Sequence, residues 1–226
     1  MTTETTPQAR LRDAKLSLVQ AHILDVAEQV FGAAGFVGAR VRDVAARAGI
    51  SLATLYAHFP NKLELYRAVH ARRLGELRRA VRPAGRGADP LDRMLIAIEG
   101  YVAFHVAHPD YLRMHLQEGI AWSARDGLRT AEQARAWSRG QEDMARTFRD
   151  GTRAGLFVDD DPVSMARATN ALHQVALTRW LETGMKEPAE ALLPRVKAQF
   201  IRAFCAPARV PRLLATRISD GRQGDA

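Results

Sequence analysis

The twenty residues from Asp43 to Lys62, DVAARAGISLATLYAHFPNK, gather side chains that can bind DNA. Hydroxyl, phenol and imidazole groups can hydrogen-bond to phosphates or bases, and methyl groups can contact thymine. The residues that carry them on the outer side of the stretch after Ser51 are Leu52, Ala53, Thr54, Tyr56, Ala57 and His58. None is Arg or Asn, which read bases through paired hydrogen bonds. Part of the sequence specificity is therefore expected from Arg40, Arg42 or the shape of the DNA.

The same stretch predicts a helix-turn-helix. Residues 41–48 form one short helix, Gly49 supplies the positive backbone angle of a tight turn, and Ser51 caps a second helix over 52–58. That second helix is about 10 Å long, so it fits a major groove about 12 Å wide. A shared apolar core is expected from Val44, Ala45, Ala48, Ile50, Leu55 and Phe59.

Charge is divided unevenly along the 226 residues. The net charge is +6 over residues 1–82, zero over 83–206 and +2 over 207–226. A basic N-terminal segment joined to a neutral body is typical of a polyanion-binding module attached to a part with another partner. The alternative is a general preference for arginine, since 29 arginines stand against 4 lysines, but that preference does not explain the neutral body.

Helices are predicted along the whole chain, and no segment reads convincingly as a strand. Apolar residues at helical spacing predict a helix from Lys15 that ends at Gly35, and Asn61 with Glu64 resembles a capping box that opens a long helix to about Arg82. Proline at the first helical position marks four later starts, at Asp89-Pro90, His108-Pro109, Asp161-Pro162 and Glu187-Pro188. With a helix over about 128–154, the total is about nine, an all-α fold.

These elements divide the chain into four parts. Residues 1–14 are expected to form a disordered arm, 15–66 a three-helix DNA-binding head, 67–206 a larger helical body, and 207–226 a mobile tail with prolines and little periodicity. The Pro- and Gly-rich segment VRPAGRGADP marks a joint within the body.

The region from about Ile23 to Leu65 resembles the DNA-binding domain of the tetracycline-repressor (TetR) family of regulators. The matching positions are Ala27, Phe31, Gly35, Val41 to Ala45, Ala48 to Ser51, Thr54 to Tyr56, His58, Phe59 and Lys62. The resemblance implies a homodimer whose two heads reach successive major grooves of a near-palindromic operator. It also implies a helical body that binds a small molecule and thereby releases the DNA, so we expect a ligand-responsive regulator, most simply a repressor.

Carried over residue by residue, the resemblance implies that Arg42, Ser51, Thr54, Tyr56, His58 and Lys62 lie at the DNA, with Tyr56 and Lys62 on phosphates. Lys62 at a helix N-terminus opposes the helix dipole, and a nearby phosphate would account for that placement. The chain departs from the family pattern at Arg40, where the family has a Thr or Ser cap, and at Leu52-Ala53, where a Lys-Gly or similar pair is usual. The operator sequence therefore cannot be transferred.

The body carries a mixed aromatic and polar stripe that suits a pocket wall. The candidate lining residues are Tyr101, His105, Tyr111, His115, Glu118, Trp122, Trp137, Met144, Phe148 and His173. A partly solvated face explains the stripe on the helix after Pro109 equally well, and core packing is the stronger alternative for Trp137, Met144 and Phe148. A lining of this kind favours a small apolar or aromatic molecule with one or two hydrogen-bonding groups.

A dimer interface is expected on the last two long helices. The helix after Pro162 is apolar on several sides, and the next repeats one apolar stripe, so both need partners. The interface candidates are Leu172, Val175, Ala176, Trp180, Leu192, Val196 and Phe200, and burial within one subunit is the alternative.

Two other classes of protein fit less well. An enzyme would need a phosphate loop, a nucleophile elbow or a Cys and His pair, and none is found. A peripheral membrane protein would use the arginines near the end of the helix before Arg82, although a solvated helix C-terminus explains these better. His105 and His108 need not share a face, so no metal or cofactor is expected. A single cysteine, Cys205, and the absence of a signal-peptide segment predict a cytoplasmic protein.

Overall fold

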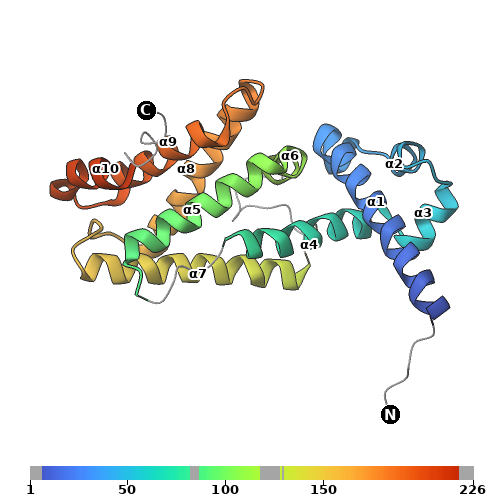
Figure 1. Ribbon diagram of the computed structural model, residues 1–226, viewed down its shortest axis with the longest axis horizontal. Coiled ribbons are helices and arrows are strands. Elements are labelled where there is room, and N and C mark those ends of the chain that lie inside the picture. The colour runs from blue at the N-terminus through green and yellow to red at the C-terminus, as the bar shows by residue number, and fades with distance from the viewer. Residues whose placement is uncertain (1–6, 82–86, 118–127, 129, 219–226) are drawn as a thin grey trace, which may run out of the picture.

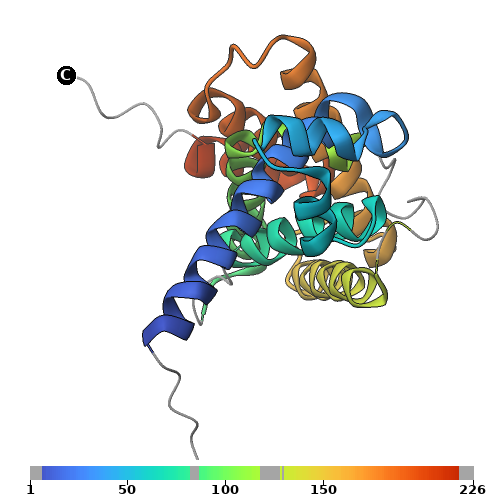
Figure 2. The same cartoon turned by 90° about the vertical axis from the view of Figure 1, so that its right-hand side faces the viewer.

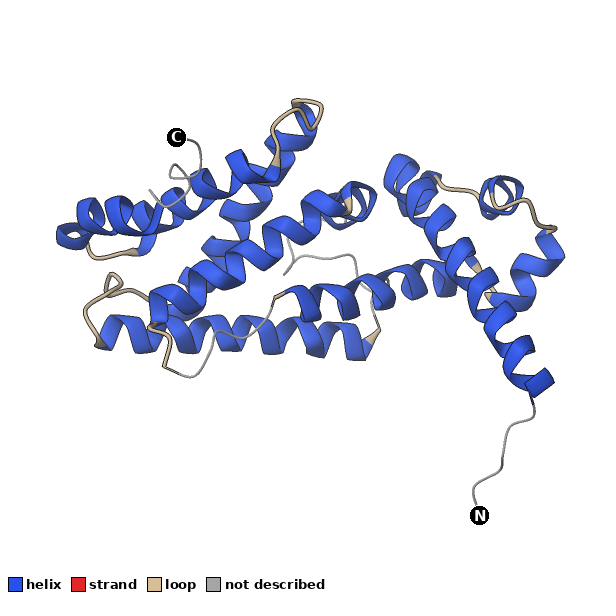
Figure 3. Cartoon of the chain, viewed as in Figure 1, coloured by secondary structure: helices blue, strands red, loops and turns tan. Residues whose placement is uncertain are grey.

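Helices make up every regular element of the computed structural model, which describes residues 7–81, 87–117, 128 and 130–218 (Figures 1 and 3). Within these ranges there are ten α-helices, one short 3-10 helix and no strand, apart from a single antiparallel bridge between Phe157 and Cys205. The predicted all-α class is confirmed. The nine expected helices are all present, and one more follows them.

The head consists of α1 (Pro7–Gly38), α2 (Val41–Arg47) and α3 (Leu52–His58). Its predicted core is confirmed at Val44, Ala45, Ala48, Leu55 and Phe59, which are all buried, while Ile50 is half-buried. Gly49 has a φ of 67°, so it takes the left-handed conformation that the turn between α2 and α3 requires. Figure 2 shows α1 crossing beside these two short helices.

Helix α1 begins earlier than predicted, at Pro7 rather than Lys15, so residues 7–14 are helical instead of forming an arm. Its N-terminal half extends away from the rest of the molecule in both views (Figures 1 and 2). There Leu11 and Leu18 are exposed, because no other element covers them. The predicted stop at Gly35 is present as a kink with φ 68° and ψ 170°, after which the chain makes one more turn.

Helix α4 (Lys62–Ala80) joins the head to the body without a break. The side chain of Asn61 accepts a hydrogen bond from the Glu64 amide at 2.9 Å, which is half of the predicted capping box. The expected boundary between residues 66 and 67 falls inside this helix. Head and body are therefore connected by one continuous rod, which lies along α7 in the body and reaches α1 in the head (Figure 1).

Five further helices form the body: α5 (Pro90–Ala107), α6 (Pro109–Gln117), α7 (Ala131–Arg153), α8 (Pro162–Glu182) and α9 (Ala189–Phe204). Asp89 and Asp161 cap α5 and α8 through the predicted Asp-Pro pairs. The prediction at Glu187-Pro188 was off by one residue, because Pro188 is the cap and α9 begins at Ala189. A full capping box between Thr130 and Gln133 opens α7.

The C-terminal segment differs from the expected mobile tail. Pro207–Arg209 form the 3-10 helix η1 and Val210–Ile218 form α10, which packs against α9. Val210, Leu213, Leu214 and Ile218 are half-buried against the core. Their spacing of three, one and four is that of one helix face. The prolines at the start of this segment favoured the incorrect prediction of a mobile tail.

A phenylalanine cluster closes the end of the body farthest from the head. Phe148, Phe157, Phe200 and Phe204 are buried, and their ring centroids lie 5.1 to 6.1 Å apart. The amide of Val158 donates to the Phe204 carbonyl at 2.9 Å, which fixes the α7–α8 turn against the end of α9. Burial raises the pKa of the neighbouring Cys205 thiol to about 11.

Candidate DNA-binding surface and ligand cavity

Helix α3 is held by its cap and presents most of its remaining surface to solvent. The Ser51 hydroxyl accepts a hydrogen bond from the Thr54 amide at 3.0 Å and lies 2.8 Å from the Thr54 hydroxyl. Leu55 anchors the helix to the head with none of its surface exposed. Tyr56, on the opposite side, is 44% exposed. A seven-residue helix is thus fixed by one buried side chain and can offer its other faces to a partner.

Seven of the nine candidate DNA contacts are exposed: Arg40, Arg42, Ser51, Leu52, Ala53, Thr54 and Tyr56. Arg40 stands at the cap position of α2 and makes no side-chain cap hydrogen bond, as the departure from the family pattern predicted. The Arg42 side chain is 66% exposed and lies 3.7 Å from the Asp43 carboxylate. His58 is half-buried at the end of α3, with its ring 6.4 Å from that of Phe59.

Lys62 has contacts within the head that the sequence did not reveal. Its Nζ donates to the carbonyl of Val37 at 3.1 Å and lies 4.9 Å from the centre of the Phe36 ring. The ammonium therefore sits at the carbonyl end of α1, where a cation is favourable. These contacts account for a lysine at the start of α4 without a phosphate. Its role at DNA stays a prediction.

A cavity of about 260 Å³ lies in the body between α4, α5, α7 and α8. Of the predicted lining residues, Tyr101, Trp137 and Met144 stand in its wall. The sequence analysis missed the contribution of α4, which supplies Leu74, Leu77, Arg78 and the adjoining Val81, and the two amides Gln141 and Asn170. The other wall residues are Arg93, Met94, Ala97, Ala136, Gly140, Asp143 and Thr147.

A second, much smaller hollow of about 30 Å³ adjoins this cavity and shares Leu74, Leu77 and Trp137 with it. Its remaining lining is His70, His105, Tyr111, His115 and Gln133. Three predicted residues, His105, Tyr111 and His115, are therefore brought together here. Phe148 belongs instead to the phenylalanine cluster, and Glu118 and Trp122 lie outside the described residues.

The buried imidazoles of His105 and His173 are neutral at physiological pH. Burial lowers the pKa of His105 to about 4, despite a hydrogen bond from its Nδ1 to the Tyr101 carbonyl at 2.9 Å, and burial likewise lowers the pKa of His173 to about 4. Both rings pack against Tyr101, with centroids 4.2 and 5.5 Å away. The predicted candidate His173 thus lies behind the cavity wall and supports Tyr101.

Comparison with known proteins identifies the head. The sequence model for bacterial regulatory proteins of the tetR family matches residues 23–69, which contain the end of α1, both short helices and the first part of α4. The chain belongs to the TetR family. It is therefore a DNA-binding transcriptional regulator, from a family of regulators and not of enzymes.

Two curated relatives extend this match. The transcriptional repressor SCO4008 of Streptomyces coelicolor is 29% identical over 147 residues, which cover 63% of this chain and 69% of the repressor. The transcriptional activator FasR of Mycolicibacterium smegmatis is 38% identical over 86 residues, which cover 38% of this chain and 39% of the activator. These two relatives therefore include a repressor and an activator.

A solved structure shares the fold over both parts of the molecule. A proposed transcriptional regulator from Saccharomonospora viridis, solved in complex with choline, superposes with a TM-score of 0.67 and 21% sequence identity. The superposition covers 84% of this chain and 99% of that one. The head with a helical body is thus the arrangement of this TetR-family chain, and members of the family bind operator DNA and small ligands.

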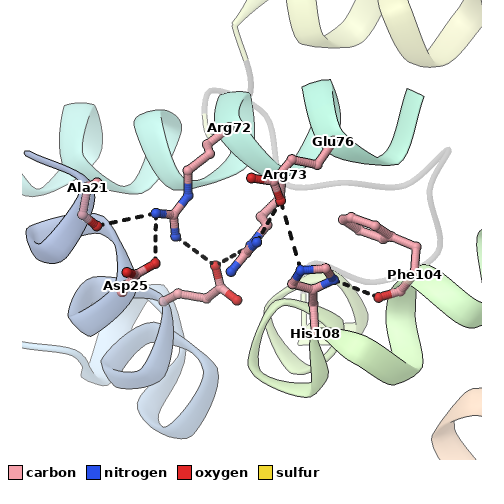
Figure 4. Close-up of polar contacts among 8 residues, drawn as sticks. Ala21, Asp25, Arg72, Arg73, Glu76, Phe104 and His108 are labelled. Carbon is pink, nitrogen blue, oxygen red and sulfur yellow. Dashed lines mark hydrogen bonds and ion pairs between the residues drawn. The ribbon is translucent and has the colours of Figure 1, made fainter. Parts of the chain in front are cut away.

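An ion-pair network fastens α4 to the head (Figure 4). Arg72 contacts the Asp25 carboxylate at 2.8 Å and the Glu28 carboxylate at 3.3 Å. The Arg73 Nε donates to the same Glu28 oxygen at 2.6 Å. Glu28 is 5% exposed, so this carboxylate of α1 is buried between two guanidinium groups of α4.

The network continues from α4 to the body. Arg73 Nη1 donates to Glu76 at 2.5 Å, and the same Glu76 oxygen lies 3.9 Å from His108 Nε2 (Figure 4). His108 is held by its Nδ1–H, which donates to the Phe104 carbonyl at 2.8 Å. Burial lowers the pKa of Arg73, but the hydrogen bonds that it donates to Glu28 and Glu76, together with the charges of these carboxylates, outweigh burial, and the net pKa is raised. One arginine of α4 therefore stays charged while it pairs with a carboxylate of α1 and with Glu76, which in turn lies near His108.

The predicted interface residues fall into two groups. Trp180, Leu192, Val196 and Phe200 are buried inside the single chain, as is Ala176, so the stripe on α9 packs in the subunit's own core. The Trp180 Nε1 donates to the Glu187 carbonyl at 2.7 Å. Val175 is 71% exposed and Leu172 is half-buried. Of the predicted interface residues, only Leu172 and Val175 on one face of α8 therefore remain accessible to a partner.

Potential metal ligands and membrane-spanning helices were two further features of interest in the described part of the chain. His105 and His108 each bond a carbonyl one turn earlier, and no group of three or more potential metal ligands occurs among the residues that the structure describes. None of the described helices is both long enough and apolar enough to cross a lipid bilayer.

Proposed function

We propose that this TetR-family regulator is a repressor that binds a near-palindromic operator as a homodimer and is released by a small, mainly apolar effector. The proposal rests on α4, which both lines the cavity and contacts the head. Leu74, Leu77 and Arg78 of this helix line the cavity, while Arg72 and Arg73 pair with carboxylates of α1. A ligand that displaces α4 therefore moves the head.

The cavity wall supports an apolar effector. Leucine, methionine, valine, alanine and aromatic side chains make up most of it, beside the polar residues Arg78, Arg93, Gln141, Asp143, Thr147 and Asn170. Such a lining binds by burying apolar surface and orients the ligand through a small number of hydrogen bonds. A preference of the effector for one position of α4 by a few kcal/mol is enough to change DNA occupancy.

A second copy of the chain is the partner that we propose for the exposed face of α8. Along this face Ala168, Leu172, Val175 and Arg179 follow each other at spacings of four, three and four. Pairing α8 with its two-fold mate would bury this stripe and place two copies of α3 on one side. Sedimentation velocity tests it: we expect a dimer, and Val175→Glu should dissociate it. A wild-type monomer would contradict the proposal.

Repression is the sign of regulation that the comparison favours. The repressor relative aligns with 63% of the chain and thus with part of the body, whereas the activator relative aligns with 38%. In a promoter assay with an operator placed at the start site, a repressor lowers transcription and an added effector restores it. Higher transcription on addition of the protein would assign activation instead.

DNA binding is tested by footprinting on the DNA that flanks the protein's own gene. We expect a protected near-palindrome, weaker binding for Arg42→Ala and Tyr56→Ala, and a salt dependence that flattens by about one unit in slope for a lost phosphate contact. Arg202→Ala, an exposed arginine on α9, is the matched control and should bind as the wild type does. Equal loss in all three variants would count against α3 as the reading helix.

A further inference from the structure

The small hollow beside the cavity contains a buried acceptor that has no donor. His105 is 1% exposed, and its Nε2 has no hydrogen-bond partner among the residues that the structure describes. Buried polar atoms are normally paired, so such an atom needs an explanation. His105 lines the hollow next to the ligand cavity, where a bound molecule can supply the partner.

The tautomer of His105 follows from its other nitrogen. Nδ1 lies 2.9 Å from the Tyr101 carbonyl, and a carbonyl can only accept, so Nδ1 carries the proton. Because the ring is neutral, Nε2 has a lone pair and no hydrogen. Nδ1 is turned toward the previous turn of α5, so Nε2 on the other side of the ring faces away from its own helix. It therefore accepts a hydrogen bond and cannot donate one.

The dimensions of the two spaces limit what can reach this acceptor. The hollow of about 30 Å³ holds one group of the size of a water molecule, which occupies about 30 Å³ in the liquid. The adjoining cavity of about 260 Å³ corresponds to about nine water molecules at about 30 Å³ each in the liquid. An occupant thus has an apolar part of about nine non-hydrogen atoms and a small polar end.

Charge disfavours a carboxylate inside the small hollow. Among its described lining residues the small hollow has three histidines and no Lys or Arg. The arginines of the larger cavity do not line the hollow: Arg78 is exposed, and Arg93 pairs with Asp150 at 2.9 Å, while the buried Nε of Arg93 has no partner among the described residues. A carboxylate placed beside a neutral imidazole acceptor would be desolvated without a counter-charge, which is strongly unfavourable.

We infer that the effector is an uncharged, mainly apolar alcohol whose hydroxyl donates a hydrogen bond to Nε2 of His105. The alkyl or ring portion fills the cavity between Leu77, Met94 and Trp137. A further polar atom of the effector can use the Asn170 Nδ2 or the Gln141 Oε1 in the cavity wall, which also have no partner among the described residues. This inference rests on the proposed function as a ligand-responsive regulator.

Isothermal titration calorimetry with three matched probes tests the inference on the full chain. Nonan-1-ol has a donor, nonan-2-one has the same number of non-hydrogen atoms without a donor, and nonanoate is charged. One hydrogen bond of ordinary strength makes nonan-1-ol bind about tenfold more tightly than nonan-2-one, and nonanoate should bind more weakly than both.

Two variants at one position separate the acceptor from the ring. His105→Leu removes the acceptor at similar volume, and His105→Gln retains an oxygen that can replace Nε2, while both lose the bond to the Tyr101 carbonyl. We expect the preference for the alcohol to disappear in His105→Leu and to persist in His105→Gln. Equal binding of alcohol and ketone to the wild type, tighter binding of nonanoate, or no binding of any probe would overturn the inference.

The same probes distinguish this failure from failure of the proposed function. Operator binding is measured separately by footprinting. A chain that binds nonan-1-ol but no DNA would refute the proposed regulator while the alcohol site stands. A chain that binds its operator but shows no preference for the alcohol would refute the alcohol site while the regulator stands.

Discussion

Removal of the Glu28 carboxylate is the perturbation that should reveal most about how the head is held. In Glu28→Ala, Arg72 and Arg73 lose the acceptor that they share, and their side chains are only 20% and 14% exposed. Breaking a fully buried ion pair costs about 3–5 kcal/mol. Here Arg72 keeps Asp25 and Arg73 keeps Glu76, so neither cation is left alone, and we expect a loss of about 2–3 kcal/mol.

Thermal unfolding followed by circular dichroism measures this loss. For a chain of this length about 1 kcal/mol corresponds to roughly 2–4 °C, so the midpoint should fall by about 4–12 °C. Glu99→Ala is the matched control, because Glu99 pairs with Lys197 at 2.7 Å but is 56% exposed. An exposed pair of this kind contributes about 0–1 kcal/mol.

The comparison of the two variants decides the question. If Glu28→Ala lowers the midpoint no more than Glu99→Ala does, the buried network does not stabilise the contact between α1 and α4. A double-mutant cycle with Arg73→Ala then gives the pairwise energy directly, and a coupling indistinguishable from zero would refute the reasoning.

Three further predictions follow from local features. Because burial lowers the pKa of His105 and His173 to about 4, protonation favours the unfolded chain, and stability present above about pH 6.5 should fall by about 2 kcal/mol per histidine at pH 5, measured by urea unfolding at both pH values. Gly151→Ala would drive a methyl group into the Phe157 ring and should cost about 1–3 kcal/mol in the same assay, whereas a neutral result would show that α7 can shift. Ser51→Ala removes the α3 cap and should cost about 1 kcal/mol of stability and weaken operator binding, and unchanged affinity would mean that the cap does not position the helix.

The head could be predicted because its determinants are local. The Ser51 cap, the positive φ of Gly49 and the apolar spacing around Leu55 all act within a few residues, and each of them is present in the structure. Lys62 shows where local reasoning stops. Its position against the helix dipole was read correctly, but the carbonyl of Val37 that compensates it is 25 residues away in sequence.

The cavity was predicted less completely, because its walls come from four helices. Aromatic residues marked Tyr101 and Trp137, yet nothing in the periodicity of α4 separated Leu77 from an ordinary core leucine. The stripe on α9 was misplaced for the opposite reason. It is as apolar as an interface, but α5, α8 and α10 pack around α9, and Phe148 and Phe157 contact Phe200, so the stripe is buried within one subunit.

The close crossing of α1 and α6 limits how the DNA-binding head can be exchanged between regulators of this kind. Gly32 leaves no space for a side chain, since a Cβ there would lie 2.7 Å from the Asp110 carbonyl, and Gln117 donates to the Gly32 carbonyl at 3.1 Å. A hybrid protein that grafts this head onto a foreign body must therefore bring along the α6 surface that fits it. A hybrid gene joined within α4 would separate α1 from the α6 surface that packs against it.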